Sequence, residues 1–293
     1  MISAVEARQD ARRLKRNRFV MGLARGLAGA LLFALPMLMT MEMWYLGFYI
    51  SRERLLLLML LNIPLLIVLS HRIGFEKTLT WREAIRDAIV AYGIGIVAST
   101  VILLAFGLLK GDMPLSEWIG KIALQAVPAS IGAMLGRSQL AGDADDEDED
   151  EDDEEDDEEQ ERKTSYGGEL FLMAAGALFL SLNVAPTEEM IVLAYKMTPW
   201  HALAILVLSI GLMHGFVYAV SFEGGHELSP ETPWWHAFIR FTLPGYAIAL
   251  MISLYALWTF ERINDTASVE IIISMIVLGF PAALGAAAAR LIL

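Results

Sequence analysis

Long apolar stretches alternate with short polar or charged stretches along most of the chain. A helix needs about 20 apolar residues to cross the hydrocarbon core of a membrane. Eight stretches approach or exceed that length, and we predict helices at residues 19–46, 55–70, 84–109, 115–135, 168–187, 200–221, 236–260 and 268–291. The predicted fold class is therefore all-α, a polytopic membrane protein with eight transmembrane helices.

The first and fifth apolar stretches are versions of each other. Residues 28–43 read AGALLFALPMLMTMEM and residues 175–190 read AGALFLSLNVAPTEEM, and the two align without a gap. Polar and bulky residues of later helices also recur in register: Trp81, Arg86, Glu117, Pro128 and Arg137 return as Trp235, Arg240, Glu270, Pro281 and Arg290. This pattern indicates an internal duplication. Four spans in each repeat would bring both repeats into the membrane from the same side, so we predict two parallel four-helix repeats.

Charge divides the chain into four predicted segments. Residues 1–18 are a basic N-terminus, which the positive-inside rule assigns to the cytoplasm. Residues 19–140 and 167–293 are the two transmembrane repeats. Between them, residues 141–166 include an unbroken run of fifteen acidic residues at 145–159, which cannot bury apolar surface and is predicted to be a disordered acidic linker. Both termini and the linker are then predicted to be cytoplasmic.

Composition agrees with this class and excludes several others. Hydrophobic residues make up 56% of the chain and the mean hydropathy is +0.51, values typical of membrane proteins. The net charge of −13 comes from the acidic run, since the remaining residues are net positive. Without cysteine there are no disulfides and no thiolate metal sites or nucleophiles. We find no nucleotide-binding fingerprint, no zinc-protease motif, no serine nucleophile elbow and no nucleic-acid footprint.

Carboxylates that recur near the ends of the first and fifth helices are the main candidate site. The candidates for an ion or proton site are Glu42, Glu189, Glu188, Thr40 and Thr187. We expect each carboxylate near the C-terminal end of its helix, where it opposes the helix dipole. Pro36 and Pro186 would add local helix breaks that free nearby backbone carbonyls. Carboxylates, hydroxyls and carbonyls together suit a hard cation or a proton relay. Alternatively, both glutamates lie just outside the hydrocarbon and are solvated.

Secondary candidates have stronger structural explanations. Glu117 and Glu270 begin predicted helices, where a carboxylate favours the helix dipole. His214 could transfer protons, but hydrogen bonding between helices is the default explanation for it, as for Asn62 and Asn183. His226 and His236 share a loop with Glu223 and Glu227, but their spacing matches no recognisable metal site, so the metal is left unassigned. We expect no cofactor.

Two segments resemble a known family. The APTEE segment at 185–189 and the PAALGAAAAR segment at 281–290, within the two-half pattern, are similar to a family of bacterial integral membrane proteins of unknown function. The resemblance covers most of the chain outside the acidic linker. It implies a bacterial inner-membrane location and supplies no activity.

The first functional hypothesis is a small transporter or channel for cations or protons, since duplicated parallel halves place a pseudo-twofold interface within the membrane. The alternative is a non-transporting membrane scaffold or assembly partner. No catalytic constellation is visible, so we expect no enzyme. The expected partners are the lipid bilayer and a cation or proton. The acidic linker would either bind a basic protein partner or act as a solvated spacer.

Overall fold

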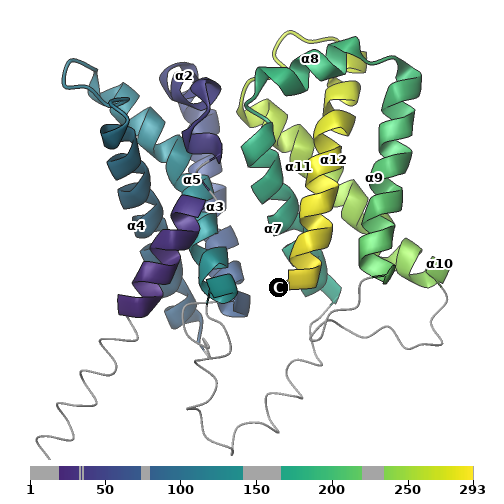
Figure 1. Cartoon of the computed structure of the whole chain (residues 1–293), viewed down its shortest axis with the longest axis horizontal. Coiled ribbons are helices and arrows are strands. Elements are labelled where there is room, and N and C mark those ends of the chain that lie inside the picture. Colours follow the sequence, from purple (N-terminus) through teal and green to yellow (C-terminus); the bar gives the residue numbers. More distant parts are fainter. Residues whose placement is uncertain are drawn as a thin grey trace, which may run out of the picture. The chain divides into compact units, whose positions relative to one another are not determined.

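The computed structural model of the chain describes residues 20–32, 34, 36–73, 80–140, 166–219 and 234–292. Every regular element among these residues is a helix, so the predicted all-α class is confirmed for the described part of the chain (Figure 1). The basic N-terminus at 1–18 and the acidic linker up to residue 165 lie outside the described residues.

Seven of the described helices are long and apolar enough to cross a membrane. They are α3 (Arg52–Ile73), α4 (Trp81–Ala105), α5 (Leu115–Leu140), α7 (Tyr166–Val184), α9 (Pro199–Ala219), η2 together with α11 (Phe238–Thr259) and α12 (Ser268–Ile292). The N-terminal helix is also apolar, but it is described without interruption only over Val20–Leu32. The chain is therefore an all-α polytopic membrane protein, and the eighth span stays a prediction.

The predicted single helix at 19–46 is wrong, because the structure divides it into two helices. Helical structure is described at residues 20–32, 34 and 36–38, and α2 (Met41–Tyr49) begins only after Thr40. Thr40 has φ −91° and ψ 132°, an extended conformation that interrupts the helix. With nine residues, α2 is too short to cross the hydrocarbon core.

The second half has a break at the corresponding place. Helix α7 ends at Val184, and α8 (Glu188–Lys196) begins after Thr187, which is extended with φ −73° and ψ 142°. Pro186 explains the break, because proline has no N–H and disfavours helical conformation in the residue before it. Helix α8 also has nine residues and joins α7 to α9 across the end of the bundle (Figure 1).

The chain forms two compact units. Unit 1 comprises Met1–Met39 and Leu57–Asp145, and unit 2 comprises Thr40–Leu56 and Asp146–Leu293. Helix α2 and the beginning of α3 thus belong to the same unit as α7 to α12.

Within unit 1, α5 is the central helix. In the most apolar 18-residue segment of α5, 83% is buried inside the protein, compared with 33% for the same kind of segment in α4. Helices α4 and α5 pack with their backbones in contact, since a Cβ atom on Gly95 would lie 2.7 Å from the Ala126 carbonyl oxygen. A side chain at Gly29 would likewise lie 2.6 Å from Cα of Gly136, so the N-terminal helix also packs closely on α5. Such contacts through small residues are typical of membrane helices.

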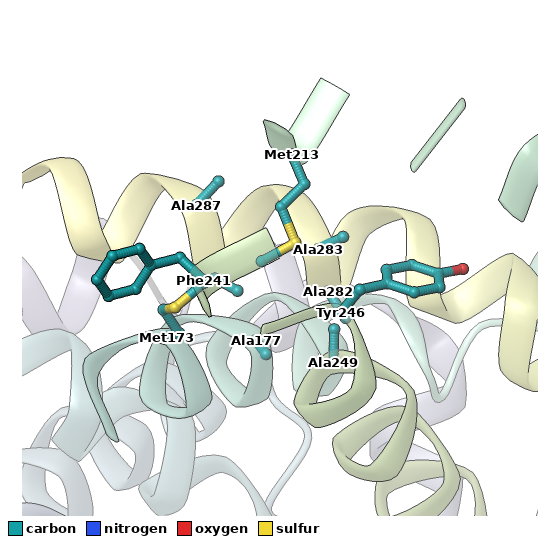
Figure 2. Packing of buried hydrophobic residues seen from close by; sticks show 10 residues of the cluster. Met173, Ala177, Met213, Phe241, Tyr246, Ala249, Ala282, Ala283 and Ala287 are labelled. Atoms are coloured by element: carbon teal, nitrogen blue, oxygen red, sulfur yellow. The ribbon is translucent and has the colours of Figure 1, made fainter. Parts of the chain in front are cut away.

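Within unit 2, α12 packs against α7, α8, α9 and α11. Its alanines form one side of a core that also contains Met173, Met213, Phe241 and Tyr246 (Figure 2). The methyl groups of Met173 and Met213 fill the space where Gly245 would carry a Cβ atom. Bulky side chains from neighbouring helices therefore fill the space beside Gly245 and beside the alanines of α12.

The predicted helix at 236–260 begins with a wider turn. Helix α10 (Trp234–Ala237) leads into the π-helical turn η2 (Phe238–Thr242), and α11 (Leu243–Thr259) follows. Pro244 lies at the start of α11 and has no N–H for the carbonyl of Arg240, four residues earlier. The Tyr166 hydroxyl from α7 donates a hydrogen bond to that carbonyl at 2.8 Å.

Candidate functional site

The break in each half changes the electrostatic position of the candidate carboxylates. Glu42 lies in the first turn of α2, and Glu188 and Glu189 lie in the first turn of α8. The expectation that these carboxylates sit at helix C-terminal ends is therefore wrong. They lie at helix N-termini, where the helix dipole favours a negative charge, because Thr40 and Thr187 each start a new helix.

Exposure differs among the five candidate residues. Glu188 and Glu189 are exposed, whereas Glu42, Thr40 and Thr187 are half-buried. The Thr187 hydroxyl donates a hydrogen bond of 2.9 Å to the Val184 carbonyl at the end of α7. Thr187 thus uses its proton locally, and its oxygen can still accept.

One backbone carbonyl at the break in the second half already has a cationic partner. The guanidinium Nη2 of Arg262 donates a hydrogen bond to the Pro186 carbonyl. Arg262 also lines an open hollow of about 320 Å³ together with Glu188, Glu261 and the apolar residues Ile191 and Val192. One carbonyl at this break is therefore already occupied by a cationic side chain of the protein itself.

The loop between α11 and α12 connects this hollow to the start of α3. Glu261 has a positive φ of 62°, which is uncommon for a residue other than glycine. Its Oε1 accepts a hydrogen bond of 2.8 Å from the Ser51 backbone N–H. Arg54 donates to the Trp258 carbonyl and to Asn264 Oδ1, and its guanidinium lies over the Trp258 ring. These contacts hold segment 40–56 within unit 2.

Glu261 was not among the candidate residues predicted from the sequence. A signal was available in the aligned repeats, because Glu261 stands where the first repeat has Gly107, and a glycine beyond a helix end marks a left-handed backbone.

The two secondary candidates, Glu117 and Glu270, have different surroundings. Glu117 Oε1 and Lys121 Nζ form a salt bridge of 2.6 Å, and their side chains are only 15% and 8% exposed. Lys121 also donates to the Leu108 carbonyl, which secures the loop between α4 and α5. Glu270 is in the first turn of α12, and Ser274 stands where the first repeat has Lys121. Both glutamates begin helices, as predicted, but Glu117 has a buried lysine as its counterion.

His214 lies beside the π-helical turn. Its Nδ1 is 3.0 Å from the Thr242 hydroxyl, and its ring packs edge-on against Phe238 at 5.2 Å between centroids. The default explanation, hydrogen bonding between elements, is confirmed for His214. It is also confirmed for Asn62, whose Nδ2 donates to Ser130 Oγ of α5 at 2.9 Å. Asn183 instead donates to the Phe179 carbonyl of its own helix.

Among the described residues, no group of three or more His, Asp or Glu side chains could hold a metal ion. His226 lies outside the described residues, as does most of the loop at 222–236.

Comparison with known protein families gives a match over most of the chain. The sequence profile of a family described as "Putative integral membrane protein (DUF2391)" matches residues 22–293. No curated protein and no solved structure matches the chain.

Proposed function

Because the chain belongs to this family of integral membrane proteins of unknown function, we propose an activity from the site itself, that of a small transporter or channel for cations or protons. The observation that carries the proposal is the break in the first helix of each half. Each break leaves helix-end carbonyls near a hydroxyl and the first-turn carboxylates of a short helix. Discontinuous helices of this kind line ion and substrate paths in transporters.

Packing contacts support the internal duplication on which this proposal depends. Gly29 packs against Gly132 and Gly136 of α5 in unit 1. Gly176, the counterpart of Gly29, packs against Gly285 and Ala289 of α12 in unit 2. Gly285 and Ala289 are the counterparts of Gly132 and Gly136 at a constant shift in the sequence.

The proposal includes a location and an orientation. We place the chain in the bacterial inner membrane with both termini and the acidic linker in the cytoplasm, since the basic N-terminus at 1–18 obeys the positive-inside rule. This orientation puts Arg54 and Arg262 on the opposite side, and their structural contacts account for these exceptions to the positive-inside rule. We assign no enzymatic role to the chain.

A flux assay tests the proposal. The full chain would be reconstituted into vesicles, and uptake of protons and of several monovalent and divalent cations would be followed with entrapped fluorescent indicators. We expect Glu42→Gln and Glu189→Gln each to reduce flux while leaving membrane insertion intact. Glu53→Gln is the matched control, because Glu53 is an exposed carboxylate in the first turn of α3. Equal losses in all three variants would contradict the assigned site.

One observation favours the alternative of a membrane scaffold or assembly partner. Glu188 and Glu189 are exposed, as expected of solvated carboxylates outside the hydrocarbon. If the vesicles show no flux for any ion, and both variants fold normally, the scaffold hypothesis replaces the transport hypothesis.

A further inference from the structure

Unit 1 contains unpartnered polar atoms among three of its helices. Asn62 of α3 is 2% exposed, and its Nδ2 donates to Ser130 of α5. Its Oδ1 is buried and accepts no hydrogen bond from a described residue. The Tyr92 hydroxyl of α4 is also buried and faces the Asn62 side chain without reaching hydrogen-bond geometry. An acceptor and a hydroxyl thus lie close together, each with unused hydrogen-bonding capacity.

These polar atoms lie deep in the span, where leaving them without a hydrogen-bond partner costs free energy. Asn62 and Tyr92 lie near the middle of α3 and α4, which are both long enough to span the membrane. The hydrocarbon at this depth supplies no hydrogen bonds, so a buried polar group there needs a partner inside the protein. Most such groups in native structures are satisfied by protein atoms or by ordered water.

Unit 2 repeats the arrangement with a different residue. The shift that aligns the first helices pairs Asn62 with Ser209, and the shift that aligns α4 with α11 pairs Tyr92 with Tyr246. Ser209 and Tyr246 are 1% and 4% exposed. The Tyr246 hydroxyl faces Ser209 but makes no direct hydrogen bond to a described residue. The same pair of positions thus leaves a tyrosine hydroxyl unpartnered in both units.

We propose that each unit binds an internal water molecule at this point in the middle of the span. In unit 1, the Tyr92 hydroxyl donates to the water, and the water donates to Asn62 Oδ1. In unit 2, Tyr246 donates to the water, and the water donates to Ser209 Oγ, which has already given its own proton to the Ile205 carbonyl at 2.7 Å. The two sites therefore have the same donor-to-acceptor direction.

The chemistry of the four side chains fits water better than a cation. None of them carries a carboxylate, and a hard cation at low dielectric needs anionic ligands or several carbonyl oxygens. Water both donates and accepts, which matches one hydroxyl donor and one acceptor atom at each site. The inference does not depend on the transport function, because a water site stabilises the unit whether or not the chain conducts ions.

Radiolytic hydroxyl labelling tests the proposal on the full chain in lipid nanodiscs. Ordered water inside a protein yields hydroxyl radicals on X-ray exposure, and mass spectrometry locates the modified side chains. We expect Tyr92 and Tyr246 to be labelled well above Phe241, a buried aromatic residue of the unit 2 core. Labelling in water enriched in oxygen-18 shows that the added oxygen comes from water.

Two variants act as reciprocal controls. Asn62→Leu should reduce Tyr92 labelling to the level of Phe241 and leave Tyr246 unchanged. Ser209→Ala should do the reverse. Tyrosine labelling no higher than that of Phe241 in the unmodified chain overturns the proposal, and this comparison needs no variant to fold. Labelling that ignores the local substitution also overturns it.

Discussion

Gly107 and Glu261 occupy the same backbone position in the two units. Each is the second residue beyond its helix, after α4 and α11, with φ of 68° and 62°. The next residue closes the helix end in both cases: Leu108 N–H donates to the Leu103 carbonyl and Arg262 N–H to the Leu257 carbonyl, both at 2.9 Å. This is the bonding of a glycine-type helix end, and unit 2 has a glutamate where glycine is preferred.

Replacing Gly107 tests the importance of the left-handed backbone. Gly107→Ala should lower the free energy of unfolding by about 1 kcal/mol, because a Cβ atom disfavours positive φ. No heavy atom lies within 4 Å of the new methyl group, so the effect comes from the backbone alone. Thermal unfolding in detergent measures it. Gly111→Ala is the control, since Gly111 is in the same loop with equal space and no positive φ.

The contacts of paired glycines give a second prediction. Gly29→Ala and Gly176→Ala should each destabilise the chain by roughly 1–3 kcal/mol, because the added methyl group overlaps the backbone of α5 or α12. The measurement is the fraction of monodisperse protein after heating. Gly93→Ala and Gly211→Ala, where the space is open, should be tolerated. Loss of folding in the open-site variants would show that the glycines act through flexibility, not close packing.

The buried ion pair in unit 1 predicts a non-additive effect. Lys121→Met should destabilise the chain by about 3–5 kcal/mol, because it leaves the Glu117 carboxylate buried without its counterion. Adding Glu117→Gln should restore much of the loss. A double-mutant cycle from denaturant unfolding measures the coupling. Additive effects of the two substitutions would mean that Glu117 and Lys121 do not stabilise each other.

Arg262 is predicted to hold the start of α8. Arg262→Met should raise hydrogen exchange at residues 188–196, because the Pro186 carbonyl loses its donor. Mass spectrometry of the peptide covering α8 measures the change. Arg52→Met, at an exposed arginine of α3, is the control and should leave exchange in α8 as it is. If exchange in α8 is equal in both variants, the Arg262 contact does not secure the helix.

Topology is open to a direct measurement. Reporter fusions at residues 5, 150 and 293 should all report the cytoplasm if each repeat crosses the membrane four times. A periplasmic signal at residue 150 would require an odd number of spans in the first half. The N-terminal helix would then not cross the membrane, and the parallel-repeat proposal would fail.

The membrane class and most helices could be predicted from the sequence, because hydrophobic length is a local property. The stretches around α4, α5 and α12 each have enough apolar residues in a row to span a bilayer. The short helices α2 and α8 were not predicted, although Pro36 and Pro186 indicated local helix breaks. Hydropathy alone does not show that the extended conformation of Thr40 and Thr187 starts a new helix after each break.

The candidate site depended on tertiary structure in a different way. The sequence by itself determined that Glu42 and Glu189 are counterparts and that Glu117 and Glu270 begin helices. Only the fold decided that the i,i+4 pair of Glu117 and Lys121 is buried, that Arg262 takes the Pro186 carbonyl, and that Glu261 contacts Ser51 across 210 positions. Hydrophobic length indicates which segments enter the membrane. The partners of Arg262 and Glu261 come from elements distant in the sequence, and only packing brings those elements together.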